Sequence, residues 1–342
     1  MTSQMRLKPI AGVLQLALLL GCAADPAGPS PRAEFNAAGT IAATRAVEDA
    51  FRVGPWLSFR TLGTAMGARF AGSMPAAPLS AGAPRLPFEV RGRTLVYDPV
   101  LEYYVVDEAR TGAPANGVRF VLYEVDSHTG RPIVAHEIGF AQITDEGDAL
   151  PTGVALHLQV FTGGVRRLDY VVRSDGNETS GMLVAAGTAG DGADALRFEI
   201  GVARVRFATG SEPPPAGDSV AMRFAFELPA HGFAATGAMR NVSDGAGTVG
   251  EAAVAVRVGA DLIELNARGD NAAMEAAFRV NGRLFARVIG EPSNPVIHGD
   301  GGRPLTEGER QALAGIMTMV DGVFGVVQAL LQPAGALLGV GQ

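Results

Sequence analysis

Apolar and polar residues alternate along most of the chain between Phe88 and about Ile289. The clearest stretch is residues 219–228, where every second position is apolar and the intervening positions are small or charged. A period of two is typical of a β-strand with one buried face. The pattern therefore predicts a strand whose buried face carries Val220, Met222, Phe224, Phe226 and Leu228.

The same alternation recurs in residues 154–160, 168–172, 196–202 and 274–280, and Asn-Gly, Asp-Gly and Gly-Asp pairs separate the runs. Such pairs favour tight hairpin turns. We therefore expect roughly twelve strands, mostly joined by hairpins, in one β domain over residues 88–290. A sheet of more than about ten strands rarely stays open and flat. The predicted fold class is mainly β, a large curled antiparallel meander sheet with helices packed on it.

Helical periodicity appears outside this region. Apolar residues recur at steps of three and four within residues 35–70, where we expect two helices in a hairpin, and the Pro-rich residues 71–87 then form a connector. Further along, Thr306 and Glu309 have the spacing of a capping box, and apolar residues follow at helical spacing until a proline. Residues 291–342 are therefore predicted to form a loop and one helix that packs on the same domain.

The first residues have the features of a secretion signal. Arg6 and Lys8 precede an apolar run of about eleven residues, which is too short to span a bilayer comfortably. The run ends in Leu-Leu-Gly-Cys at residues 19–22. An ordinary signal peptide that happens to be followed by a cysteine is one interpretation of this segment.

The tetrapeptide also resembles the lipobox of bacterial lipoproteins. This resemblance implies cleavage after Gly21, removal of residues 1–21 as a signal peptide and lipidation of Cys22, with residues 22–34 as a flexible tether. Alanines rather than an aspartate follow Cys22. By the same resemblance, they favour the outer membrane of the bacterial cell envelope as the location of the lipid anchor.

Composition excludes several classes of function. The chain carries 28 Lys and Arg against 35 Asp and Glu, a formal net charge of −7, so the basic surface of a nucleic-acid-binding protein is absent. Cys22 is the only cysteine. The chain can therefore form no internal disulfide, and no cysteine is left for a zinc site or a catalytic thiol elsewhere.

Few residues have the spacing of a catalytic or metal site. His136 and Glu137 lack the second histidine of a zinc-binding HExxH helix. Gly217, Asp218 and Ser219 resemble the nucleophile block of GDSL-type hydrolases, but the Asp-x-x-His of that family does not follow. We therefore expect no catalytic residue, no metal and no cofactor.

A lipid-anchored, curled sheet is similar in plan to the LolA and LppX type of lipoprotein carriers. This similarity implies a non-catalytic envelope protein that contacts the membrane through its N-terminal lipid and binds a lipid or other hydrophobic ligand on the face around Phe224. The alternative is a structural or interaction lipoprotein of the outer membrane, and an uncharacterised envelope enzyme is the third hypothesis. A C-terminal helix in the concave face would exclude a lipid, whereas a helix outside it would leave an apolar cavity.

Overall fold

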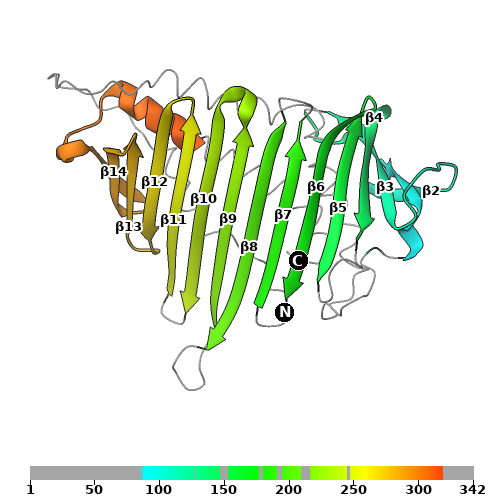
Figure 1. The fold of residues 1–342 in the computed structure, drawn as a ribbon, viewed down its shortest axis with the longest axis horizontal. Coiled ribbons are helices and arrows are strands. Elements are labelled where there is room, and N and C mark those ends of the chain that lie inside the picture. Colours follow the sequence, from blue (N-terminus) through cyan, green and yellow to red (C-terminus); the bar gives the residue numbers. More distant parts are fainter. Residues whose placement is uncertain are drawn as a thin grey trace. The chain divides into compact units, whose positions relative to one another are not determined.

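The computed structural model describes residues 86, 88–126, 128–146, 153–176, 180–190, 195–208, 216–244 and 247–318. Fifteen strands account for most of them, ordered β15-β14-β13-β12-β11-β10-β9-β8-β7-β6-β5-β4-β3-β1-β2 in a mixed sheet (Figure 1). The chain divides into two compact units, whose described parts are residues 86–203 and 204–318. The residues of β8 (Leu196–Ala208) are divided between them.

The first unit is built from strands that are mostly antiparallel. It contains a 3₁₀ helix (Phe88–Val90) and the strands β1 (Arg93–Asp98), β2 (Tyr103–Asp107), β3 (Gly117–Val125), β4 (Pro132–Asp145), β5 (Val154–Thr162), β6 (Val165–Gly176) and β7 (Ser180–Ala189). Only β1 and β3 are parallel neighbours among these strands. Because β2 lies beyond β1 at the end of the sheet, the chain passes β1 again on its way to β3.

The second unit is an antiparallel meander followed by a helix. Its strands are β9 (Ala216–Leu228), β10 (Phe233–Asp244), β11 (Gly247–Val258), β12 (Asp261–Gly269), β13 (Met274–Val280), β14 (Arg283–Glu291) and β15 (Asn294–Gly299), with 3₁₀ helices at Pro229–His231 and Asp300–Gly302. Each of these strands pairs with the next along the chain. The C-terminal helix is described over residues 307–318.

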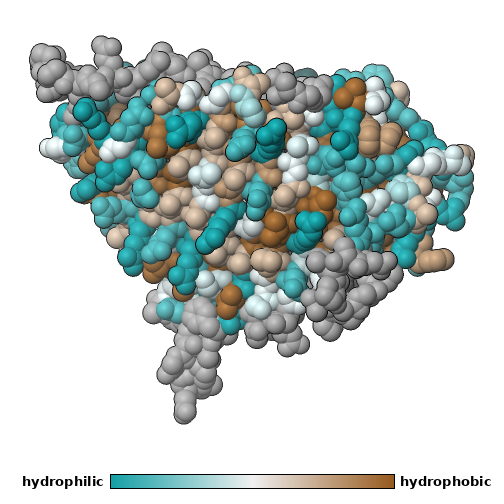
Figure 2. All heavy atoms as spheres, in the orientation of Figure 1, coloured by the Kyte–Doolittle hydropathy of each residue, from teal (hydrophilic) through white to brown (hydrophobic). Residues whose placement is uncertain are grey.

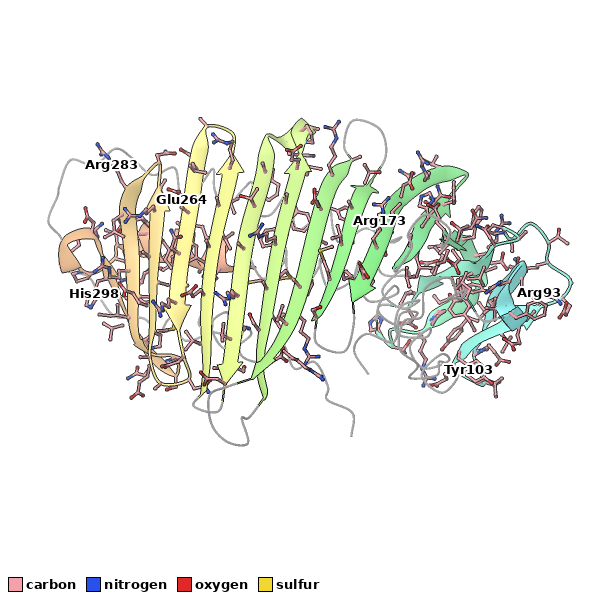
Figure 3. The ribbon with its side chains drawn as sticks, turned by 60° about the horizontal axis from the view of Figure 1, so that its bottom comes forward. Arg93, Tyr103, Arg173, Glu264, Arg283 and His298 are labelled. Carbon is pink, nitrogen blue, oxygen red and sulfur yellow. The ribbon has the colours of Figure 1, made fainter. Side chains whose placement is uncertain are left out.

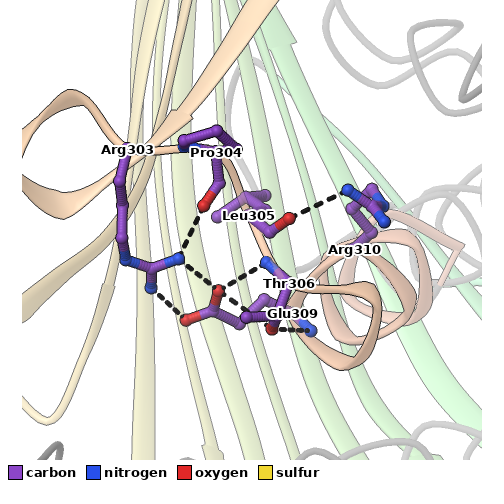
Figure 4. A network of polar contacts seen from close by, with 6 residues as sticks. All are labelled: Arg303, Pro304, Leu305, Thr306, Glu309 and Arg310. Carbon is purple, nitrogen blue, oxygen red and sulfur yellow. Dashed lines mark hydrogen bonds and ion pairs between the residues drawn. The ribbon is translucent and has the colours of Figure 1, made fainter. Parts of the chain in front are cut away.

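The C-terminal helix begins with the predicted capping box. The backbone N–H of Glu309 donates to Oγ1 of Thr306 at 3.3 Å, and the Glu309 carboxylate accepts from the backbone N–H of Thr306 at 2.9 Å (Figure 4). Arg303 donates to the same carboxylate at 2.8 Å. Burial by itself would raise the pKa of Glu309, but these hydrogen bonds lower it overall. The carboxylate is therefore charged where it caps the helix.

The prediction of a mainly β fold is confirmed, with two corrections. The described residues contain fifteen strands rather than about twelve. The short strands β1, β2 and β15 hold only five or six residues each, which is too few to show a clear alternation. The sheet is also mixed rather than wholly antiparallel, because β1 lies between β2 and β3.

Several predicted segments lie outside the described residues. These are the signal peptide 1–21, the tether 22–34, the helical hairpin 35–70, the connector 71–87 except Leu86, and the C-terminal helix beyond residue 318. Of the three predicted helices, the described part of the chain therefore contains only the C-terminal one. No helix in this part has the length and apolar character needed to cross a membrane.

A glycine lies opposite a buried aromatic residue in each of the two units. Tyr170 of β6 is opposite Gly187 of β7, and Phe224 of β9 is opposite Gly237 of β10. A Cβ atom added to Gly237 would lie 2.2 Å from Cε1 of Phe224, and one added to Gly187 would lie 2.1 Å from the backbone oxygen of Asp169. Gly237 therefore leaves room for the Phe224 ring, and Gly187 allows the backbones of β6 and β7 to approach closely.

Candidate functional site

The five residues predicted to face a hydrophobic ligand share one face of β9. Phe224, Phe226 and Leu228 are 4%, 2% and 3% exposed, while Val220 and Met222 are half-buried. The alternating residues Ala225 and Glu227 are more exposed than these three side chains, so the predicted alternation is confirmed there. We call the face that carries the five side chains the inner face of the second unit.

Side chains of the sheet itself fill much of the inner face. Phe233 and Ala235 of β10 lie opposite Leu228 and Phe226, and both are buried. The ring centroids of Phe224 and Phe226 are 5.3 Å apart, with the ring planes at 43°. Together with the close approach of Phe224 to β10, these contacts indicate a packed surface rather than an open one.

The C-terminal helix lies on the inner face. It crosses behind β11–β13 in Figure 1 and lies on the same side of these strands in Figure 3. Figure 2 shows the opposite side, where hydrophilic side chains lie among paler and some hydrophobic ones. The helix buries Ala312, Leu313 and Ile316, which are 0%, 3% and 1% exposed. The helix therefore covers this side of the sheet at β11–β13 with a buried apolar surface.

A row of polar side chains crosses the first unit on the face away from its apolar core. Cross-strand register places its members side by side, one from each of the strands β1, β3, β4, β5 and β6: Thr94, Arg119, Gln142, Gln159 and Asp169. Residues in register share one face of a sheet. We call these five residues the polar row, which is about 19 Å long because neighbouring strands are about 4.8 Å apart.

An aromatic ring and an amide hold Arg119 in the polar row. The guanidinium carbon lies 4.3 Å from the ring centroid of Phe140. Phe140 in turn stacks on Phe161, with the centroids 4.9 Å apart and the planes at 26°. With the Gln142 amide oriented so that its oxygen faces Arg119, this oxygen accepts from Nη2 at 2.6 Å and from Nε at 3.1 Å. These contacts hold the guanidinium in one orientation.

Arg119 has no carboxylate partner among the described residues, unlike Arg110 and Arg204. Hydrogen bonds from Arg110 to Glu137 and from Arg204 to Asp218 raise the pKa of each of these arginines. Burial instead lowers the pKa of Arg119. No carboxylate in the described part of the chain forms an ion pair with it, and no described group accepts a hydrogen bond from its Nη1.

The neighbour of Arg119 in the polar row is also incompletely bonded. Thr94 is 2% exposed, and its Oγ1 has no hydrogen-bond partner among the described residues. A buried hydroxyl without a partner costs free energy. Thr94 and Arg119 therefore place two unsatisfied donors side by side on one face of the sheet.

The other end of the polar row is charged and paired. Oδ1 of Asp169 lies 2.5 Å from Nε2 of His157, and Oδ2 lies 2.6 Å from Nη1 of Arg166. The second ring nitrogen of His157 is 3.3 Å from Glu146. Nε2 of Gln159 also donates to Oδ1 of Asp169 at 3.5 Å, so these side chains form a local network of polar contacts on β5 and β6.

The other residues singled out in the sequence are not brought together as a catalytic site. Nδ1 of His136 lies 2.9 Å from Oε2 of Glu124. Ser219 lies within β9, and Asp218 beside it accepts from Nε of Arg204 at 3.0 Å. In the described ranges, no three His, Asp or Glu side chains are grouped in the manner of metal ligands.

The lipidation residue Cys22 and the cleavage residue Gly21 lie outside the described residues. The polar row was not predicted from the sequence. Alternation indicates that Gln159 and Asp169 point away from the core, but it does not identify them as neighbours. That pairing depends on the register, which shifts between Val160 and Phe161.

No protein-family model matches the chain. A search of curated proteins finds no match, and a search of solved structures finds none either.

Proposed function

We propose that this chain is a non-catalytic, lipid-anchored protein of the bacterial cell envelope, whose C-terminal helix fills the core and whose exposed sheet faces do the binding. The observation that carries this proposal is the burial of the inner face. Phe224, Phe226 and Leu228 are at most 4% exposed with only the atoms of the chain around them. A filled core favours an interaction protein over a lipid carrier.

The carrier alternative requires a different inner face. A lipid-binding site needs an apolar cavity of several hundred Å³. On this face, the helix residues Ala312, Leu313 and Ile316 are themselves buried. Opening the part of this face that the helix covers would expose these apolar side chains, which costs free energy.

The proposed anchor is the lipid attached to Cys22. Its support is the lipobox resemblance of residues 19–22 and the position of the single cysteine directly after the apolar run. Acyl chains on Cys22 would hold the protein at the membrane through burial of their methylene groups. Because alanines follow Cys22, we propose the outer membrane as its location.

Replacing Cys22 by serine tests the anchor. When the chain is expressed in a bacterium that is fed labelled palmitate, we expect the unchanged protein to be labelled and to fractionate with the membranes. Cys22→Ser should carry no label, because serine offers no sulfur for lipid attachment. Ala23→Ser is the matched control and should be labelled like the unchanged protein. An unlabelled Cys22 protein would show that the anchor is wrong.

A further inference from the structure

We propose that the outer face of strands β10–β13 is the contact surface of a homodimer, in which a second copy of the chain packs the same face against it. The outer face is the side of the second unit opposite the C-terminal helix, and it is the side seen in Figure 2. The proposed function places binding on an exposed face of the sheet, and this inference rests on it in that respect only.

A row of alternating charges crosses the outer face. Cross-strand register places its members side by side, one from each of the strands β10, β11, β12 and β13: Arg240, Glu251, Arg268 and Glu275. We call these four exposed residues the charged row. Nε of Arg268 lies 3.6 Å from Oε1 of Glu251, and their side chains remain 73% and 53% exposed. Contacts within the row are therefore loose and leave the charges accessible to a partner.

The charged row is complementary to a second copy of itself. Most homodimers are closed by a twofold axis. An axis that runs along the strands, midway between β11 and β12, reverses the order of the strands and keeps each residue at its height along them. It places Arg240 opposite Glu275 of the second copy, and Glu251 opposite Arg268 of that copy. An axis that runs across the strands along the charged row would instead oppose each charge to itself.

The two rows beside the charged row fit the same arrangement. In register they hold Ala238, Ala253, Asn266 and Ala277, and then Thr236, Ala255, Glu264 and Arg279. The axis along the strands opposes Glu264 to Ala255 and Arg279 to Thr236, so no like charges meet in these rows. Packed sheets lie about 10 Å apart. Small side chains leave this gap open, and an arginine and a glutamate from opposite sheets can meet across it.

The extent of the surface predicts a weak dimer. Arg223 of β9 and Arg287 of β14 lie level with Ala238 and Ala277, and the axis would oppose them to each other. This repulsion limits the contact to β10–β13. Four strands about 4.8 Å apart, with about seven residues of each in contact, cover about 450 Å² per chain and about 900 Å² in total. Interfaces of this size are typical of weak, transient complexes.

Sedimentation equilibrium of the Cys22→Ser chain at roughly 1–300 μM tests the dimer, for which we expect a Kd of roughly 10–100 μM. Arg240→Glu and Glu275→Arg should each weaken it at least tenfold, because each opposes like charges at two equivalent contacts. Arg173→Glu, at an exposed arginine of β6, is the matched control and should leave the Kd unchanged. Circular dichroism checks that every variant is folded.

An equal mixture of the Arg240→Glu and Glu275→Arg chains tests the proposed axis. In a heterodimer of the two, opposite charges meet again at both contacts. We therefore expect the mixture to dimerise about as strongly as the unchanged protein, whereas a defect in the fold of either variant would persist. Three results would overturn the proposal: a monomer at every concentration, a dimer that Arg240→Glu leaves unchanged, or a mixture as weak as the single variants. None of them depends on lipidation of Cys22 or on the inner face, so the proposed function would be judged separately.

Discussion

Replacing Phe226 by alanine is expected to lower the free energy of unfolding by about 3–5 kcal/mol. Phe226 is 2% exposed, its ring lies beside that of Phe224, and its cross-strand partner Ala235 is too small to fill the space left by the ring. The paired strands can close such a cavity only in part. On an open ligand-binding face the loss would be much smaller, because the ring would already be in contact with water.

Urea denaturation at neutral pH measures this effect. The dependence of the free energy of unfolding on urea concentration should be the same in the variant and the unchanged protein. Arg223→Ala is the control on the same strand, where the side chain is exposed, and should change stability by no more than about 0.5 kcal/mol. Phe226→Leu removes less volume and keeps the measurement possible if the alanine variant does not fold. A loss below about 1 kcal/mol for Phe226→Ala would contradict a filled inner face.

The free energy of unfolding is expected to fall steeply as the pH rises above 10. Burial raises the pKa values of Tyr104 and Tyr170, which are 2% and 1% exposed. In the unfolded chain both groups ionise near pH 10. Above that pH the folded state therefore binds more protons than the unfolded state, and the stability that is complete below pH 10 is lost. Each tyrosine lowers the free energy of unfolding by about 1.4 kcal/mol per pH unit, so the two together lower it by about 2.8 kcal/mol per pH unit.

The composition of the chain makes this alkaline effect easy to isolate. Lys8, in the predicted signal peptide, is the only lysine, so no lysine of the remaining chain titrates in the same range. Urea denaturation at pH 9.5, 10.5 and 11.5 measures how fast the free energy of unfolding falls with pH. Tyr170→Phe should reduce it by about 1.4 kcal/mol per pH unit, and Tyr104→Phe should do the same although it also removes a hydrogen bond to the Val121 carbonyl. A stability independent of pH up to 11.5 would show that these tyrosines are not buried as described.

The features that depend on local sequence were predictable. Residues 219–228 alternate strictly and lie within β9, because one face of that strand is buried and the other is not. Thr306 and Glu309 form the predicted capping box, because both hydrogen bonds join residues three positions apart. Such features need no knowledge of distant parts of the chain.

The features that depend on register and strand order were not predictable. The parallel pairing of β1 with β3 arises because β2 occupies the outer side of β1, and no local pattern indicates that placement. The contact of Arg119 with Phe140 joins two strands, and its continuation to Gln159 and Asp169 requires the register of two more pairs. One bulge changes such a register for every residue that follows.

A chain that fills its own core holds no lipid against β9. Native mass spectrometry of the Cys22→Ser chain, purified from a bacterial envelope with its organic extract analysed in parallel, tests for such a lipid. We predict the mass of the protein alone and no uptake of phospholipid on mixing. One lipid per chain, lost when Phe224 and Phe226 are replaced by polar residues of similar size, would rule out a filled core and favour the carrier.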